Sequence, residues 1–503
     1  MTPTQEQFRK IRCSPRRVAT LFSVGAALIL LLITACVGDQ SAIGRVMMAM
    51  NEGSQSLPQS TRNELSRFEE VYDTYVNDAG ARERLDYFNF AFRRVRASYV
   101  YDINDAELID AAIKGVKESE VAPGKADPEM VVEDALHSML KALDPHSSYL
   151  NASEFRDSFA NTRGEFGGLG IQVTMENDLV KVISPIEDTP AERAGIQAGD
   201  LITHVDGTDV KGKSLRDAVE LMRGKPGDPV TLIVRREGRE DFEVEIVRAI
   251  IEVKSVRHRL EGDIGYIRIT RFNEKTKEGL NDAISDLRKQ SDGGLKGVVV
   301  DLRNNPGGLL AQSVIVADAF LEKGKIVSIK GRAGHNERSY YADPGDAFRG
   351  LPMVVLVNRG SASASEIVAS ALQHHRRATV MGAKTFGKGS VQTIMPLPLE
   401  GALRLTTALY YSPADQTIQA LGVTPDVDIV PKEQAGGTTR EADLPGAIPA
   451  QVLSSEKAHP SVDEAKCPEI GEAKDRALGC AVEFLRAGGE QAFFDKYRPA
   501  GQG

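Results

Sequence analysis

The sequence predicts an α+β protein of several domains, with an N-terminal helical region, a small β-domain and an α/β core. Its 503 residues exceed what one hydrophobic core usually organises. Apolar residues repeat with helical spacing before Gly164, and they alternate as in short strands after it. From Ile264 onward, strand-like runs alternate with helix-like runs, which is typical of an α/β core.

Composition excludes one class of partner. The hydrophobic share of 41% and the charged share of 26% are ordinary for a soluble globular protein. The net charge of -9 argues against nucleic acid as the main partner, since phosphate binding needs a basic face. We also expect no cofactor and no metal, because no HExxH motif or equivalent occurs.

Residues 1–36 have the layout of an export signal. Five basic residues between positions 9 and 17 precede an apolar run over 18–37. That run, about 20 residues long, could be cleaved or kept as a membrane anchor. Residues 33–36 (ITAC) resemble a bacterial lipobox, which favours lipidation at Cys36. We therefore expect a membrane-associated protein of the bacterial periplasm, with residues 37–84 as a polar linker.

Residues 85–160 are expected to be helical, because apolar residues there recur on one face of two helical stretches. The second of these stretches ends at Asp144-Pro145. The faces are Leu108, Ile109, Ala112, Ile113 and Val116, and then Val131, Ala135, Leu136, Met139 and Leu143.

Residues 163–250 are predicted to form the small β-domain, with one helix that starts at the N-cap Ser214. Glycines in the segment 166–171 (FGGLGI) allow backbone N–H groups to form a nest for a carboxylate. An extended peptide could add beside the strand that begins here, with its terminal carboxylate in the nest. Most glycine turns are merely structural, which is the alternative. The expected strands are 170–173, 179–183, 201–205, 230–235 and 242–248, and the candidate peptide-binding residues are Gly168, Leu169, Gly170 and Ile171.

Residues 251–432 are predicted to form the α/β core, and residues 433–503 a C-terminal extension. The expected strands are 264–270, 297–302 and 353–357, and the expected helices are 275–289 and 364–373. The extension shows no order until a short helix over 473–486. In an oxidising compartment, Cys467 and Cys480 would form a disulfide that stabilises a small appendage with little core of its own. In the cytosol, the two cysteines would instead be reduced and buried.

The segment 358–366 (NRGSASASE) is the strongest candidate for a nucleophile. A buried strand ends there and an amphipathic helix begins, so Ser363 lies where free amides favour developing negative charge. The alternative is that Ser363 and Glu366 form only a helix capping box.

Lys388 lies 25 residues after Ser363, in a glycine-rich turn between apolar segments. Burial there would lower the pKa of its amine and make it a base, and Gln392 could orient it. A solvated loop lysine is the alternative. A phosphate-binding loop over 382–389 is disfavoured, because Gly389 stands where Ser or Thr would bind magnesium.

Four segments together resemble the carboxyl-terminal processing, or tail-specific, serine peptidases. They are 143–150, 301–308, 358–366 and 385–392, within a resemblance that covers about 85–432. The segment 163–250 resembles a PDZ domain through its glycine loop and residues 199–207. The resemblance implies a ClpP/crotonase-like core.

The resemblance also implies a catalytic mechanism. Ser363 would be the nucleophile, Lys388 the general base and Gln392 the orienting residue. The oxyanion hole would use the amide of Ala364 and that of Gly307 or Gly308. In the family the PDZ domain captures protein tails and gates activity.

Other implications concern partners. Arg223, at the helix end of the groove, would take part in gating, although a cation also suits a helix C-terminus. An adaptor or activator protein and a homo-oligomer are further expected partners. Departures from the family at 413–415 (PAD) and His374 bear on substrate preference. A noncatalytic periplasmic PDZ scaffold that binds protein C-termini is the competing hypothesis.

Overall fold

The computed structural model describes residues 57–77, 81–119, 122–186, 188–291, 294–332, 337–430, 439–451, 459–471, 473–487 and 489–497. The chain divides into two compact units. The first extends to Ala152 and includes Thr393–Leu405; the second comprises Ser153–Gln392 and the chain from Thr406 onward. The predicted export segment 1–36 lies outside the described residues, and none of the helices within them has the length and apolarity to cross a bilayer.

The first unit is a group of helices closed by a strand pair. Its helices are α3 (Gln59–Tyr75), α4 (Arg82–Ser98), α5 (Asp105–Glu118) and α6 (Pro128–Lys141). Strand β1 (Ser148–Leu150) pairs antiparallel with the start of β18 (Ala402–Tyr411), so a segment from late in the chain completes this unit.

Helix α3 corrects one prediction. The polar linker expected over 37–84 is wrong for residues 59–75, which form a helix with Phe68 and Tyr72 buried. The ring of Phe68 stacks on that of Phe88 in α4, with centroids 3.8 Å apart. Two aromatic residues one helical turn apart are enough to bury one face of an otherwise polar helix.

The small β-domain is a six-stranded antiparallel sheet. It contains the five predicted strands and the predicted helix, together with a short strand, β6, that was not predicted. The strand order is β3-β4-β5-β7-β8, with β6 paired to β5. Strand β3 is therefore an edge strand of this sheet. The capping box of Ser214 and Asp217 starts helix α9. The bounds are β3 Ile171–Glu176, β4 Leu179–Pro185, α8 Pro190–Arg193, β5 Leu201–Val205, β6 Thr208–Asp209, α9 Leu215–Met222, β7 Pro229–Arg235 and β8 Phe242–Val247. Helix α7 (Ala152–Arg163) precedes the domain, and β2 (Glu165–Gly168) pairs with β9 (Ala249–Glu252) at its base.

The core is built on a seven-stranded sheet of order β10-β11-β12-β15-β16-β19-β20. Only β10 is antiparallel to its neighbour. The bounds are β10 Val256–Glu261, β11 Ile264–Ile269, β12 Gly297–Asp301, β15 Met353–Val357, β16 Thr379–Gly382, β19 Val427–Val430 and β20 Ser461–Asp463. Every residue of β12 and β15 is buried, because both faces of a parallel sheet are covered by helices.

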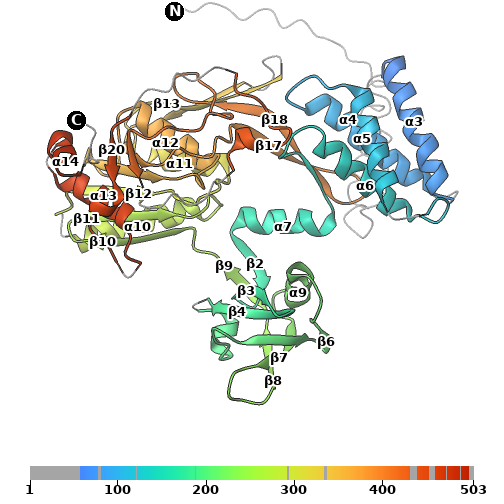
Figure 1. Ribbon diagram of the computed structural model, residues 1–503, viewed down its shortest axis with the longest axis horizontal. Helices are drawn as coiled ribbons and strands as arrows, with labels where there is room; N and C mark the ends of the chain where they lie inside the picture. Colours follow the sequence, from blue (N-terminus) through green and yellow to red (C-terminus); the bar gives the residue numbers. More distant parts are fainter. Residues whose placement is uncertain are drawn as a thin grey trace, which may run out of the picture. The chain divides into compact units, whose positions relative to one another are not determined.

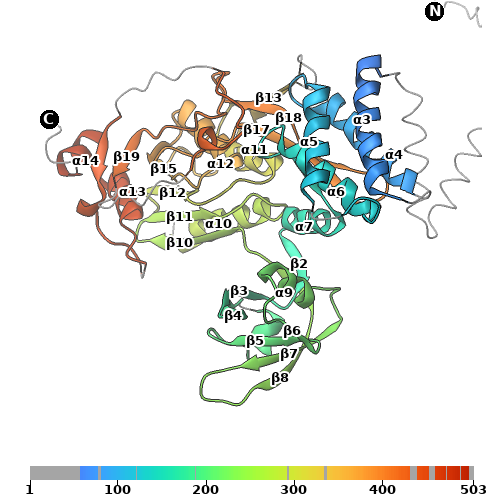
Figure 2. The same ribbon diagram turned by 45° about the vertical axis from the view of Figure 1, so that its right-hand side comes forward.

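The two faces carry different helices (Figures 1 and 2). Helices α10 (Thr276–Gln290), α11 (Leu310–Asp318) and α12 (Ala364–His374) pack with Val298 and Val300 of β12. Helices α13 (Arg476–Arg486) and α14 (Glu490–Tyr497) pack on the other face with Val299, whose side chain points opposite to those of Val298 and Val300. A second sheet contains β13 (Gly324–Gly331), β14 (Arg338–Ala342), β17 (Ser390–Pro396) and the end of β18.

The C-terminal extension is therefore part of the core. The expectation of an appendage with little core of its own is wrong, because β20 extends the sheet and α13 covers one of its faces. The predicted helix over 473–486 is present as α13, and a Cys467–Cys480 disulfide ties it to the preceding segment.

Candidate active site

Three loops meet at one edge of the core sheet. Strands β12, β15 and β16 run parallel, so the segments that follow them leave the sheet at its carboxyl edge. Those segments carry Gly307 and Gly308, Ser363, and Lys388, respectively. In parallel α/β sheets this edge is where ligands and catalytic groups gather.

Ser363 begins helix α12 in a strained backbone conformation. Its φ is 55° and its ψ is -112°, which costs a non-glycine residue about 1–3 kcal/mol and needs support from its surroundings. Part of that support is a 2.7 Å hydrogen bond from its N–H to the Glu366 carboxylate. The Glu366 N–H donates to the Ser363 carbonyl at 2.9 Å, and the predicted capping box of Ser363 and Glu366 is present. A hydroxyl that accepts a hydrogen bond keeps its own O–H, so the capping box does not exclude a nucleophile.

The neighbouring serines have structural roles. The Ser361 hydroxyl donates to the Leu302 carbonyl at 2.8 Å, and the Ser365 hydroxyl donates to the Asn305 carbonyl at 2.9 Å. Both side chains are fully buried, whereas Ser363 retains 8% exposure. The geometry therefore favours Ser363 as the nucleophile among the three.

The turn after β12 lies directly against Ser363. A Cβ built on Gly307 would lie 2.8 Å from the Ser363 Cβ, and Gly307 and Gly308 have φ of 100° and 143°. The Gly307 N–H donates to the Asn305 Oδ1 at 2.9 Å. Within the described part of the chain, the N–H groups of Gly308 and Ala364 have no acceptor. Of the two predicted candidates, Gly308 is the one with an amide available to pair with Ala364 for an oxyanion.

Glu366 connects Ser363 to the lysine turn. Its carboxylate is fully buried and accepts from the N–H of Ser363, from that of Gly387 at 2.7 Å and from that of Lys388 at 2.9 Å. The Thr385 hydroxyl donates a fourth hydrogen bond at 2.5 Å. Burial raises the pKa of Glu366 to about 7, although these donors favour the ionised form.

The lysine turn is itself rigidly held. Lys388 is half-buried between the buried Gly387 and Gly389. The Gly389 N–H donates to the Gln419 Oε1 at 2.9 Å, and a side chain at that position would overlap the Gln419 backbone. Gly387 has a φ of 99°, a conformation that favours glycine.

Gln392 lies on β17, four residues after Lys388. Its amide nitrogen donates to the Ser390 hydroxyl at 2.9 Å and to the Thr406 hydroxyl at 3.3 Å. Because the amide nitrogen of Gln392 donates both of these hydrogen bonds, its carbonyl oxygen is the atom that can accept a hydrogen bond from an amine.

Sequence reasoning missed the roles of two residues at this site. Glu366 appeared only as the partner in a helix cap, although a carboxylate beside the apolar Ile367 and Val368 was the available signal. Tyr410 of β18 is buried beside Ser363. Burial raises the pKa of its phenol to about 12, and a hydrogen bond with Ser363 opposes that rise. Nothing near Tyr410 in sequence indicated that contact.

The predicted peptide-binding loop has the geometry of a carboxylate nest. Leu169 is buried in the core of the β-domain, while its N–H and that of Gly170 have no acceptor among the described residues. Gly170 has a φ of 83°, and a Cβ there would lie 2.2 Å from Thr189. Gly168 ends β2, and Ile171 begins the free-edged β3, to which an extended peptide could pair.

Arg223 caps α9 and contacts two neighbours near this loop. Its guanidinium pairs with Asp157 of α7 and lies 5.3 Å from the ring centroid of Phe166. Its role in peptide binding or gating stays a prediction.

Two family models match this chain. Residues 167–246 match the PDZ domain, and residues 263–429 match peptidase family S41. The first range covers most of the β-domain, and the second covers the sheet strands from β11 to β19 together with the three loops.

Individual relatives agree with the family models. The carboxy-terminal-processing protease of Bartonella bacilliformis is 48% identical over 382 residues, which are 75% of this chain and 83% of that protein. A probable CtpA-like serine protease of Staphylococcus aureus is 40% identical over 62% of each chain. Among solved structures, the photosystem II D1 C-terminal processing protease is 32% identical over 69% of this chain and 93% of that one, with a TM-score of 0.44. The predicted fold class and resemblance are confirmed: this chain belongs to the carboxy-terminal-processing proteases, serine peptidases of family S41 with a PDZ domain.

Proposed function

We propose that this enzyme cleaves exported proteins at or near their C-termini with a Ser363–Lys388 dyad. One observation carries the proposal: the buried Glu366 carboxylate binds the backbone N–H of both residues. It therefore joins the nucleophile turn to the lysine turn through the backbone of each.

The mechanism is acyl transfer. Lys388, as a neutral amine, takes the proton of the Ser363 hydroxyl while the oxygen attacks a peptide carbonyl. The N–H groups of Gly308 and Ala364 hold the resulting oxyanion, and the protonated amine returns its proton to the leaving nitrogen. Water then releases the acyl group from Ser363, again with Lys388 as base. The Gln392 carbonyl oxygen orients the amine without adding charge.

Substrate selection belongs to the PDZ domain. The free N–H groups of Leu169 and Gly170 suit the terminal carboxylate of a protein tail, and the free edge of β3 suits its backbone. The ligand class is therefore an extended, unblocked C-terminus.

The proposed location is the periplasmic side of a bacterial membrane, with Cys36 as the lipidated residue. Two features support this: the basic and apolar pattern of residues 1–36, and the Cys467–Cys480 disulfide, a bond typical of oxidising compartments.

The test uses one peptide substrate with a free C-terminus and its C-terminally amidated form. Ser363→Ala and Lys388→Ala should each abolish hydrolysis while the tail peptide still binds, and Lys277→Ala, on the exposed face of α10, should retain full activity. The amidated peptide should bind and react poorly. Unchanged hydrolysis in Ser363→Ala refutes the nucleophile assignment; tail binding without turnover in the wild type supports the noncatalytic scaffold instead.

A further inference from the structure

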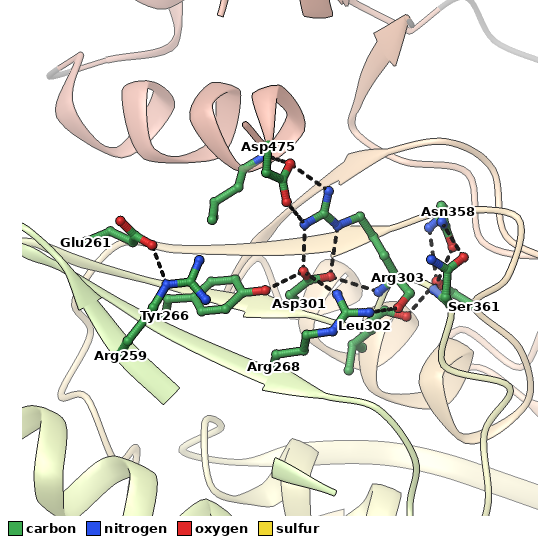
Figure 3. Close-up of polar contacts among 12 residues, drawn as sticks. Arg259, Glu261, Tyr266, Arg268, Asp301, Leu302, Arg303, Asn358, Ser361 and Asp475 are labelled. Carbon is green, nitrogen blue, oxygen red and sulfur yellow. Dashed lines mark hydrogen bonds and ion pairs between the residues drawn. The ribbon is translucent and has the colours of Figure 1, made fainter. Parts of the chain in front are cut away.

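The C-terminal helix α13 contacts the loop that carries the oxyanion turn. Asp475 is the N-cap of α13, and its carboxylate accepts from both terminal nitrogens of Arg303, at 3.0 and 2.6 Å (Figure 3). Arg303 lies two residues after β12 and shortly before Gly307 and Gly308. This bidentate ion pair is the strong, geometrically specific kind.

The opposite side of Arg303 is held by a buried carboxylate. Asp301 is fully buried and accepts from Arg303 at 3.0 and 2.7 Å, from Arg268 at 2.7 Å and from the Tyr266 hydroxyl at 2.8 Å. Arg268 also donates to the Arg303 carbonyl at 3.0 Å. Two guanidinium groups are thus balanced by two carboxylates, one of which is supplied by α13.

Loss of the second carboxylate would leave an uncompensated charge. Arg303 retains only 15% side-chain exposure, so water cannot fully replace Asp475. Burial raises the pKa of Asp301, but Arg303 and Arg268 outweigh this and hold the pKa below its ordinary value. Without Asp475, the surplus positive charge would pull Arg303 toward solvent or Asp301, and its backbone would follow.

The connection from Arg303 to the oxyanion turn is short and hydrogen-bonded. The next residue, Asn304, exchanges two 2.9 Å hydrogen bonds with Asn358 of the nucleophile loop. The following residue, Asn305, receives the N–H of Gly307 on its side chain. A shift at Arg303 therefore reaches the Gly307–Gly308 turn through two residues that are both fixed to the site.

Helix α13 is a firm support for this contact. The Cys467–Cys480 disulfide ties its middle to the preceding segment, and Leu478 is fully buried against the sheet. At its other end, Arg486 binds Asp263 and the Glu261 carbonyl, at the turn between β10 and β11. The helix thus has two ionic ties to the core, and only the one at Asp475 adjoins the oxyanion turn.

We propose that Asp475 is a positioning residue of this peptidase: through Arg303, the C-terminal extension sets the position of the Gly308 amide that stabilises the oxyanion. The inference rests on the proposed role of Gly308 and extends it to a segment outside the region that matches the peptidase family.

The variant Asp475→Asn separates this role from helix capping. Asparagine is as good an N-cap as aspartate, but it carries no charge and turns an amide nitrogen toward Arg303. We expect kcat to fall about tenfold with KM unchanged. Complete loss of an oxyanion donor lowers kcat about 100-fold or more, and here the Gly308 amide would be displaced rather than lost. Affinity for a peptide aldehyde, which forms an oxyanion on Ser363, should fall in parallel, while tail-peptide binding stays constant.

Arg486→Gln is the matched control, since it breaks the other ionic tie of the same helix. It should leave kcat and aldehyde affinity within twofold of wild type. Asp475→Ser, which also caps, repeats the test if the Asn variant does not fold. In an Arg303→Gln background, Asp475→Asn should lower kcat little further, because both substitutions break the same ion pair.

Two results would overturn the inference. One is wild-type kcat and aldehyde affinity in Asp475→Asn; the other is an equal loss in Arg486→Gln, which would indicate general loosening of the helix. Failure of the proposed function has a different signature, because Ser363→Ala would then keep the wild-type rate.

Discussion

Glu366 illustrates how a single buried side chain can hold two loops of a candidate active site together. A buried carboxylate is costly unless donors surround it, and here four donors converge from two separate loops. Three of those donors belong to Ser363 and to the Lys388 turn. The free energy of satisfying the carboxylate therefore favours the arrangement in which the Ser363 turn and the Lys388 turn lie together.

Glu366→Gln should impair catalysis more than folding. The glutamine presents one oxygen and one NH₂ group to four donors, so at least one loop must move. We expect kcat to fall about 100-fold, the scale associated with misplacing reacting groups by about 1 Å. Steady-state hydrolysis of a tail peptide measures this, with the exposed Glu278→Gln in α10 as control. Wild-type kcat in Glu366→Gln would contradict the positioning role.

The same residue predicts a pH dependence of stability. Because burial raises the pKa of Glu366 from 4.5 to about 7, the folded state binds the proton more tightly than the unfolded state. Its contribution to stability is therefore greatest below about pH 4.5, declines as pH rises to about 7 and is constant above; the total change is about 3 kcal/mol. Urea unfolding of wild type and Glu366→Gln between pH 4 and 8 measures it. A stability difference between the two that does not vary with pH would contradict the assignment.

At the scale of elements, the glycine loop and β3 can bind a peptide only if their backbone N–H and C=O groups stay accessible. Gly170→Ala places a methyl group against Thr189 in a conformation that disfavours side chains. We expect tail-peptide affinity to fall at least tenfold, measured by fluorescence anisotropy. Gly212→Ala is the matched control, because Gly212 also has a positive φ but has open space around it. Equal losses in both variants would indicate backbone strain rather than damage to the nest.

Elements were predictable where their pattern is local. The strands β12 and β15 are continuous apolar runs, and α9 and α12 follow clear N-terminal signals. Helix α3 was missed because only two of its apolar side chains, those of Phe68 and Tyr72, are buried, and polar residues surround them in the sequence. Strand β20 was missed because three residues acquire strand structure only by pairing with β19.

The candidate site was predictable in its residues but not in its connections. Family resemblance assigned roles to Ser363 and Lys388, and the structure brings their loops together. The hydrogen bond from Gly387 to Glu366 and that from Ser365 to Asn305 could not be predicted, since each joins residues far apart in the chain. Residue patterns report local backbone preference, whereas these contacts depend on which loops the sheet order places side by side.

At the scale of the whole molecule, the C-terminal extension contributes to stability. The disulfide closes a loop between cysteines 13 positions apart and holds α13 on the sheet. Replacing both cysteines with alanine should destabilise the protein by about 3 kcal/mol, as expected for a loop of this length. Thermal unfolding measures the change. An unchanged midpoint would show that packing alone holds the helix.

The order of the strands has a consequence for biosynthesis. Strand β1 finds its partner only when residues 402–404 have been made, and one face of the core sheet stays bare until α13 and α14 emerge. A nascent chain therefore displays an unfinished peptidase with apolar residues open to solvent. Proteolytic competence should therefore arise only after residues 476–497 have been synthesised, which delays cleavage of other polypeptides until this segment has joined the sheet.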